Sequence, residues 1–188
     1  MKGIDNMLRK YNVIRDIDIS DGPGVRVSIY TQGCFHCCEK CFNEETWSFH
    51  SGKVWDEDTN ANILNLLSLN RTSGLSILGG DPLAPYDERY KYKDDSSDML
   101  LELVRQSKKL FPTKTIWLWT GYLYEDFFKN DEFSNHMSKI LPYIDVIVDG
   151  RYDDTLKDYR LKYCGSKNQR VIDVQKSIAN NEIILYNE

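Results

Sequence analysis

Short apolar segments alternate with longer amphipathic segments through most of the chain. The apolar segments are rich in β-branched and aromatic residues and are bounded by Gly, Pro and Asp, which is typical of β-strands. We therefore predict strands over residues 25–32, 75–78, 115–119 and 144–148. Between them, apolar residues recur at the three- and four-residue spacing of a helix with one buried face.

Three helical regions are predicted in these intervening segments. The first begins near Thr59, with Asp58 or Thr59 as its N-cap, because a side-chain oxygen at that position can accept a backbone N–H. Ser97 is the predicted N-cap of the second, and the third covers residues 124–139. Residues 85–98, which are charged, rich in Tyr and without periodicity, are predicted to form a solvated loop, with a lid or docking loop as the second interpretation.

Strands that alternate with helices are typical of βαβ units, so the fold class is predicted to be α/β with parallel strands. Chemistry in such sheets and barrels gathers at the carboxyl ends of the strands. There the four strands are followed by the cysteine loop 33–43, Gly-Gly-Asp-Pro at 79–82, Thr-Gly-Tyr at 120–122 and Asp-Gly at 149–150. Each glycine motif alone is an ordinary turn, but their shared position marks a candidate site.

Composition limits the class of protein. The 188 residues, 41% hydrophobic and 28% charged, are typical of one soluble domain, predicted to span residues 1–188. A net charge of -5 argues against a nucleic-acid partner, and no stretch approaches the ~18 apolar residues of a membrane span. We expect a cytoplasmic protein without a membrane or nucleic-acid partner. The basic segment 155–172 is expected to be solvated surface.

Four of the five cysteines, Cys34, Cys37, Cys38 and Cys41, lie within eight residues. Such a cluster could cross-link only its own loop, so reduced thiols that bind a metal fit better than a disulfide framework. The fifth, Cys164, is expected to be a small, partly buried residue.

The metal is zinc or an iron–sulfur cluster. Structural zinc sites separate their two cysteine pairs by a long connection, whereas here the pairs abut. A four-iron cluster is larger and accepts uneven spacings. With three cysteine ligands one iron stays open, which is typical of a catalytic site. Two triples fit this count: Cys34/Cys38/Cys41 and Cys34/Cys37/Cys41.

The first triple, spaced CxxxCxxC, resembles the signature of the radical S-adenosylmethionine (SAM) enzymes. Six motifs carry a wider resemblance: DGPGVR at 21–26, the cysteine loop 33–43 followed by Thr46-Trp47, GGDPL at 79–83, WTGY at 119–122, VDG at 148–150 and GSKNQR at 165–170. In this order they are similar to the family of anaerobic ribonucleoside-triphosphate reductase-activating proteins. The sequence assigns no role to Tyr122, Asp149 or the GSKNQR segment.

The resemblance implies a set of ligands. Cys34, Cys38 and Cys41 would hold a [4Fe-4S] cluster, with Cys37 outside the ligand set. The expected SAM-binding positions are Lys40, Cys41, Phe42, Gly79, Gly80 and Asp81. Among these, Phe42 would lie against the adenine, and the two glycines would leave room for the methionine amino group. His36 is expected to be solvated or to lie behind the ligands.

The resemblance also implies a fold and a reaction. The chain is short for a complete barrel, so a shortened, open radical SAM (β/α) partial barrel is expected, with the reductase supplying the missing wall. The expected oxidoreductase cleaves SAM reductively at the cluster, and a glycine of the reductase large subunit loses its Cα hydrogen to form a glycyl radical. An unidentified electron donor is implied. Two alternatives stay open: an activase of another glycyl-radical enzyme, and a non-catalytic zinc or iron–sulfur module that binds a partner protein.

Overall fold

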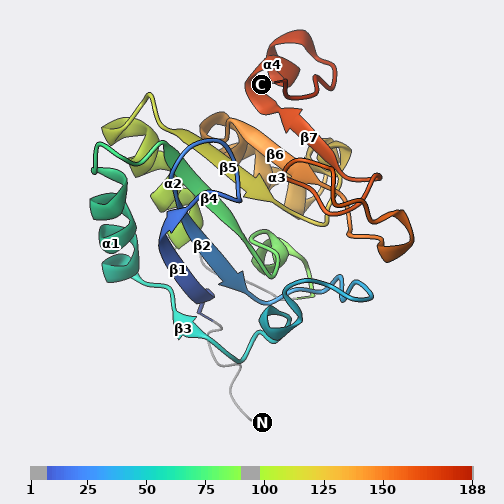
Figure 1. Ribbon diagram of the computed structural model, residues 1–188, viewed down its shortest axis with the longest axis horizontal. Coiled ribbons are helices and arrows are strands. Elements are labelled where there is room, and N and C mark those ends of the chain that lie inside the picture. The colour runs from blue at the N-terminus through green and yellow to red at the C-terminus, as the bar shows by residue number, and fades with distance from the viewer. Residues whose placement is uncertain (1–7, 90–97, 188) are drawn as a thin grey trace.

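The computed structural model describes residues 8–89 and 98–187 and arranges them around one seven-stranded sheet (Figure 1). The strands are β1 (Lys10–Asp18), β2 (Arg26–Gln32), β3 (Lys53–Val54), β4 (Gly74–Gly79), β5 (Thr115–Trp119), β6 (Val146–Asp149) and β7 (Arg170–Asp173). Their order in the sheet is β3-β1-β2-β4-β5-β6-β7. The four predicted strands are β2, β4, β5 and β6, and they pair with one another in parallel. The prediction of a parallel α/β core is therefore confirmed.

The edges of the sheet depart from the prediction. Strands β1, β3 and β7 were not expected, and each pairs in the antiparallel sense. Most of β1 is exposed or half-buried, and its pairing with β2 contains two register shifts. A partly exposed strand with an irregular register lacks the regular apolar alternation that reveals a strand in a sequence.

Helix α1 (Glu57–Leu67) begins earlier than predicted. Its N-cap is Asp56, and neither Asp58 nor Thr59 holds that position. The Asp56 carboxylate accepts the backbone N–H of Thr59 at 2.9 Å and the Thr59 hydroxyl at 2.7 Å. Thr59 therefore completes a capping box from inside the helix, which explains why it looked like a cap.

Helix α2 (Met99–Leu110) is capped by Asp98, whose carboxylate accepts the N–H groups of Leu100 and Leu101. Ser97, the predicted cap, lies outside the described residues. The predicted solvated loop over 85–98 is wrong at its start, because Pro85 and Tyr86 form a buried 3₁₀ turn.

The predicted third helical region is two elements. A 3₁₀ segment, Tyr124–Phe128, is followed by helix α3 (Glu132–Ile140). Asp131 separates them, because it adopts an extended backbone and its carboxylate caps α3 at the N–H of Ser134, 2.8 Å away. Strand β6 also begins two residues later than predicted, after a 3₁₀ turn over Leu141–Tyr143.

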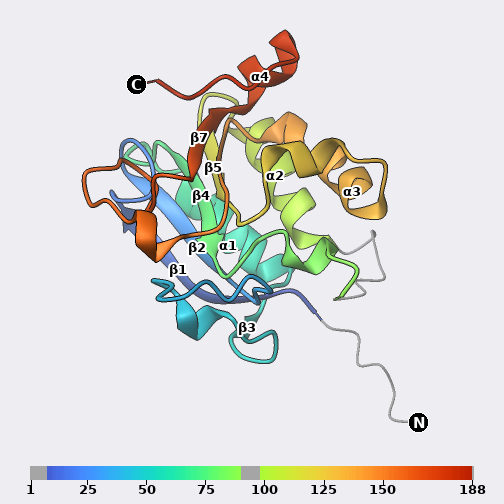
Figure 2. The same ribbon diagram turned by 90° about the vertical axis from the view of Figure 1, so that its right-hand side faces the viewer.

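Helices α1, α2 and α3 cover one side of the sheet (Figure 2). The parallel strands lie side by side in chain order, so right-handed crossovers bring their helices to the same face. The main core fills the space between, with Ile29, Ile77, Leu103 and Ile147 fully buried. A smaller cluster around Trp117 lies on the other face, where Tyr163 and Tyr186 pack against it. The short C-terminal helix α4 (Val174–Asn180) lies beyond the end of β7, with Val174 in the main core (Figure 2).

The amino ends of the parallel strands are fixed by Arg26, which is fully buried. Its guanidinium donates to the Ser76 hydroxyl at 2.6 Å, to the carbonyl of Leu75 at 2.7 Å and to that of Thr115 at 3.0 Å. The Asp21–Arg26 motif therefore joins the beginnings of β2, β4 and β5. The carboxyl ends of the same strands lie at the opposite edge and carry the candidate site.

Among the described residues, no helix has both the length and the apolar character needed to cross a membrane. The boundary prediction, one domain over residues 1–188, stays a prediction.

Candidate metal centre

The cysteine loop leaves the carboxyl end of β2 through Gly33. The N–H of Gly33 donates to the carbonyl of Thr46 at 2.7 Å, and the N–H of Cys34 donates to that of Trp47 at 3.1 Å. Gly33 has a φ of +101°, and a Cβ there would lie 2.3 Å from the Phe49 ring. Only glycine fits this entry to the loop.

Two residues of the loop, Cys37 (φ 45°) and Lys40 (φ 54°), have left-handed backbones. Such a conformation costs a non-glycine residue roughly 1–2 kcal/mol, so tertiary contacts must hold it. These residues lie on either side of Cys38 and turn the chain before and after it.

Three of the four loop cysteines line one cavity of about 130 Å³. They are Cys34, Cys38 and Cys41, which is the first of the two triples that the spacing allowed. Cys37 is exposed and is not part of this lining. The structure therefore separates Cys37 from the other three thiols.

The rest of the cavity wall comes from the carboxyl ends of β4, β5 and β6. Its residues include Gly79, Gly80, Asp81, Trp119, Thr120, Gly121 and Gly150. The strand-end motifs that the sequence singled out thus meet the cysteine loop. Within residues 8–89 and 98–187, no three Cys, His, Asp or Glu side chains are drawn together as ligands of a single metal ion.

Two of the cavity thiols, those of Cys34 and Cys38, are partly shielded from water. Burial, with the negative charge of Asp81 as a second cause, raises the pKa of Cys34 to about 12. Burial also raises the pKa of Cys38, and the neighbouring Cys41 adds to the effect. Without a bound cation the Cys34 thiol is protonated at neutral pH, and a metal that binds its thiolate must displace the proton.

Both glycines of the Gly-Gly-Asp-Pro motif are required by internal packing. Gly79 has a φ of +109°, and a Cβ there would lie 2.5 Å from the backbone N of Thr31. A Cβ on Gly80 would lie 2.5 Å from the carbonyl oxygen of Gly33. The end of β4 therefore touches the backbone of β2 and of the cysteine loop. Room for a ligand amino group remains a separate prediction.

Asp81 and His36 form a buried pair beside the cavity. The His36 side chain is only 4% exposed, and its Nε2 lies 2.8 Å from Asp81 Oδ2. Of the two expected placements of His36, the solvated one is therefore wrong, and the one behind the proposed ligands agrees with its burial. Its ring meets the Tyr122 ring edge-on, with centroids 4.7 Å apart, and the Tyr122 hydroxyl donates to Asp87 at 2.7 Å.

A second cavity of about 480 Å³ adjoins the first and shares Cys41 and Trp119 with it. Phe42, Tyr152 and Cys164 also line it. The ring of Phe42 is 62% exposed and lies 5.2 Å from that of Tyr152, measured between centroids. Cys164 is partly buried, as expected.

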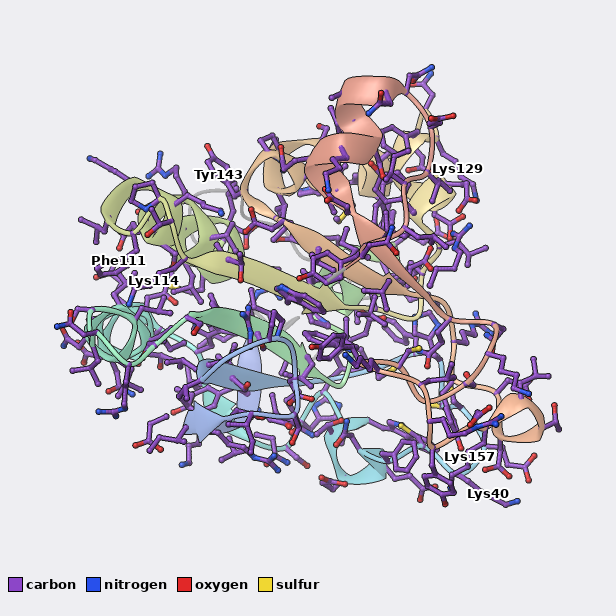
Figure 3. All side chains as sticks on the ribbon, turned by 45° about the horizontal axis from the view of Figure 1, so that its top comes forward. Lys40, Phe111, Lys114, Lys129, Tyr143 and Lys157 are labelled. Atoms are coloured by element: carbon purple, nitrogen blue, oxygen red, sulfur yellow. The ribbon has the colours of Figure 1, made fainter. Side chains whose placement is uncertain are left out.

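The basic segment 155–172 is not merely solvated surface. The ammonium group of Lys157 lies 5.0 Å above the Phe42 ring, and Lys40 pairs with Asp154 at 2.6 Å, just before the segment. Figure 3 shows Lys40 and Lys157 at the same edge of the molecule. Residues 152–157 thus lie against the cysteine loop, and one wall of the larger cavity comes from the C-terminal part of the chain.

The GSKNQR segment and Asp149 close this wall. The Gln169 amide donates to the carbonyl of Gly150 at 2.9 Å, and that of Asn168 donates to the carbonyl of Arg151 at 2.7 Å. Arg170 donates to the fully buried Asp149 from Nε at 3.0 Å. Sequence reasoning missed these pairings, because the partners are about twenty residues apart and follow no periodic pattern.

The comparisons with known proteins agree with this geometry. Residues 20–172 match the family model described as a 4Fe-4S single cluster domain. The chain is 37% identical over 161 residues to the anaerobic ribonucleoside-triphosphate reductase-activating protein of Enterobacteria phage T4, covering 86% of this chain and 92% of the relative. The chain belongs to the family of anaerobic ribonucleoside-triphosphate reductase-activating proteins. The family predicted from the six motifs is confirmed.

Cellular members of this activating-protein family are similar to the same degree. The protein of Haemophilus influenzae is 36% identical over 154 residues, which cover 81% of this chain and 90% of the relative. That of Escherichia coli strain K12 is 35% identical over 163 residues, covering 86% and 96%. The similarity therefore extends over nearly the whole length of these activating proteins.

Proposed function

We propose that Cys34, Cys38 and Cys41 hold a [4Fe-4S] cluster that leaves one iron open. The observation that carries this proposal is that these three cysteines share one cavity while Cys37 is exposed outside it. The match to a 4Fe-4S domain supports an iron–sulfur cluster. The cavity also contains an orphaned polar group, because the buried Nδ1 of His36 has no hydrogen-bond partner among the described residues. The donor set therefore fits the proposed cluster.

SAM is the proposed second cofactor, bound at the open iron and in the adjoining cavity. A volume of about 480 Å³ lies within the range of small-molecule pockets. Phe42 offers an exposed ring beside Cys41 for the adenine, with the backbone of Lys40 to Phe42 at its edge. Gly79 and Gly80 line the smaller cavity, where the methionine end would lie.

The proposed activity is that of an oxidoreductase that activates the anaerobic ribonucleoside-triphosphate reductase, the enzyme that appears in the names of the relatives. The large subunit of the reductase is the proposed target. When bound, the cluster and SAM would supply one-electron reduction and a carbon-centred radical that removes a Cα hydrogen from a glycine of that subunit. The chain itself would bind and orient both cofactors and exclude water. An electron donor is also required, and the proposed location is the cytoplasm.

The proposed architecture is a shortened, open radical SAM partial barrel. Four parallel strands in chain order with α1–α3 on one face support it, since a full (β/α) barrel repeats that arrangement until the sheet closes. The open side would admit the glycine-bearing segment of the reductase.

The ligand set is tested by comparing Cys37→Ala with Cys38→Ala after anaerobic reconstitution. Iron, sulfide and zinc are counted on each sample, and the reduced proteins are examined by electron paramagnetic resonance (EPR) with and without SAM. We expect Cys37→Ala to retain about four irons and a spectrum that changes with SAM. Cys38→Ala should lose both. The reverse pattern would overturn the ligand set, and stoichiometric zinc without sulfide would overturn the cluster.

The partner is tested by incubating the reduced protein with SAM and the reductase large subunit. A glycyl-radical EPR signal on that subunit is expected with the unaltered protein and with Cys37→Ala. SAM cleavage without a radical on this subunit would favour an activase of another glycyl-radical enzyme.

A further inference from the structure

The carboxylate of Asp81 is saturated by donors from its own chain. Its Oδ1 accepts the N–H of Leu83 at 2.9 Å, and its Oδ2 accepts the N–H of Gly121 at 2.9 Å and His36 Nε2 at 2.8 Å. The Thr120 hydroxyl lies 3.0 Å from both oxygens. An ionised carboxylate has about four acceptor positions, and four protein donors use them here.

Burial prevents a ligand from hydrogen-bonding to Asp81 in addition to these four donors. Asp81 is 1% exposed, so an incoming ligand could reach it only by displacing one of these donors. A displaced N–H or hydroxyl would be left buried without an acceptor, which opposes the exchange. Asp81 is therefore poorly suited to receive the amino group of SAM.

One of the four donors comes from the cysteine loop. Leu83, Thr120 and Gly121 belong to the chain after β4 and β5, whereas His36 lies between two of the proposed cluster ligands. The contact joins residues 45 positions apart in the sequence. A Cβ on Gly121 would lie 2.3 Å from the His36 ring, so the end of β5 also fixes the plane of the imidazole. Because a carboxylate can only accept, the proton of this hydrogen bond is on Nε2.

We infer that the His36–Asp81 pair is a tether that holds the cysteine loop against the carboxyl ends of β4 and β5, and that Asp81 is a positioning residue and not a ligand of SAM. The tether itself is a property of the metal-free chain. Its importance for the cluster rests on the proposed function.

The tether is tested on the metal-free protein through the accessibility of Cys34. Opening of the loop further exposes this partly buried thiol, whose reaction with iodoacetamide is followed by mass spectrometry. A hydrogen bond to a charged group changes such an opening equilibrium by about tenfold or more. We expect His36→Phe, which keeps a ring but has no donor, to react about tenfold faster at Cys34. Cys37 is exposed in the unaltered protein, and its rate is the internal control.

A conservative variant separates the tether from simple packing. The side-chain amide of His36→Gln can occupy the place of Nε2, whereas that of His36→Asn is shorter. We expect Gln to restore the slow rate and Asn to resemble Phe. In Asp81→Asn, replacing His36 by Phe should add little, because the same contact is already weakened. Equal reaction rates at Cys34 in all His36 variants would overturn the tether. So would a double variant whose rate increase equals the product of the increases caused by Asp81→Asn and His36→Phe alone.

The reconstituted protein tests the second half of the inference. If Asp81 bound the SAM amino group, Asp81→Asn would weaken SAM binding while keeping the cluster, and His36→Phe would leave SAM binding unchanged. The tether instead predicts that both variants release iron to a chelator faster than the unaltered protein. Because the thiol measurement needs no cluster, a failure of the proposed function leaves that result interpretable.

Discussion

Asp21 lies in the Asp21–Arg26 motif and lines the larger cavity. Its surroundings disfavour the ionised form of its carboxyl group. Burial raises its pKa from 3.8 to about 6, and the negative charge of Asp18 acts in the same direction. The Tyr30 hydroxyl donates to Asp21 at 2.7 Å and partly opposes the increase. Removing the charge should therefore stabilise the protein at neutral pH.

The magnitude follows from the two pKa values. Between pH 3.8 and about 6 the folded chain binds more protons at Asp21 than the unfolded chain, so the free energy of unfolding falls as the pH rises through this window. Above it the full penalty applies, about 3 kcal/mol for a shift of this size. Residual exposure of Asp21 and a weaker hydrogen bond from Tyr30 to an amide reduce the expected gain. Asp21→Asn should be about 1–2 kcal/mol more stable than the unaltered protein at pH 7.5.

The measurement is urea unfolding of the metal-free, reduced proteins at pH 7.5 and pH 4, both away from the calculated isoelectric point of 5.3. The difference in the free energy of unfolding between Asp21→Asn and the unaltered protein reports on Asp21, because the other titrating groups are common to both. It should shrink to about 0.5 kcal/mol at pH 4, where Asp21 is almost fully protonated in the folded chain and partly protonated in the unfolded chain. Tyr30→Phe is the matched control, since loss of the donor should enlarge the gain from Asp21→Asn. A difference that is the same at both pH values would refute the reasoning.

Four further substitutions test how the sheet, the site and helix α1 are held together. Arg26→Met should lower the free energy of unfolding by about 3 kcal/mol or more, because several buried acceptors lose their donor; a loss below about 1 kcal/mol in urea would contradict this role. Gly80→Ala should cost about 1–3 kcal/mol, because its Cβ would meet the Gly33 carbonyl. Gly150→Ala, whose Cβ would meet no atom closer than 3.6 Å, should be the milder variant by chemical unfolding, and the opposite order would show that positive φ outweighs the clash. Asp56→Ala should cost about 1 kcal/mol through loss of the α1 cap, and an unchanged unfolding midpoint would count against the cap.

The centre of the fold could be predicted from the sequence because its strands are buried on both faces. Residues 74–78 of β4 are all buried, and such strands appear as short continuous apolar runs. The edges could not be predicted in the same way. Strand β7 overlaps the end of the basic segment 155–172, and its pairing with β6 includes the Arg170–Asp149 contact, which no local pattern encodes.

In the site, too, the sequence of the loop predicts some features, whereas others depend on contacts with distant parts of the chain. Spacing reduced the ligand choice to two triples, and the motif resemblance selected the one with Cys38. The structure separates Cys37 from the shared cavity through a left-handed backbone at that residue. The burial of His36 depends on its contacts with Asp81 and Tyr122, which follow the ends of β4 and β5. Neither could be derived from the loop sequence alone.

A short chain can contain this site because its walls come from neighbouring strands. The smaller cavity uses the loop after β2 and the ends of β4, β5 and β6, which are consecutive in the sheet. Further strands in a full barrel would close the open face without adding to this wall. In the proposed function that face must accept a backbone segment of another protein, so closing it would oppose the reaction. In the proposed function, the open sheet would therefore hold the cofactors and leave space for a macromolecular substrate.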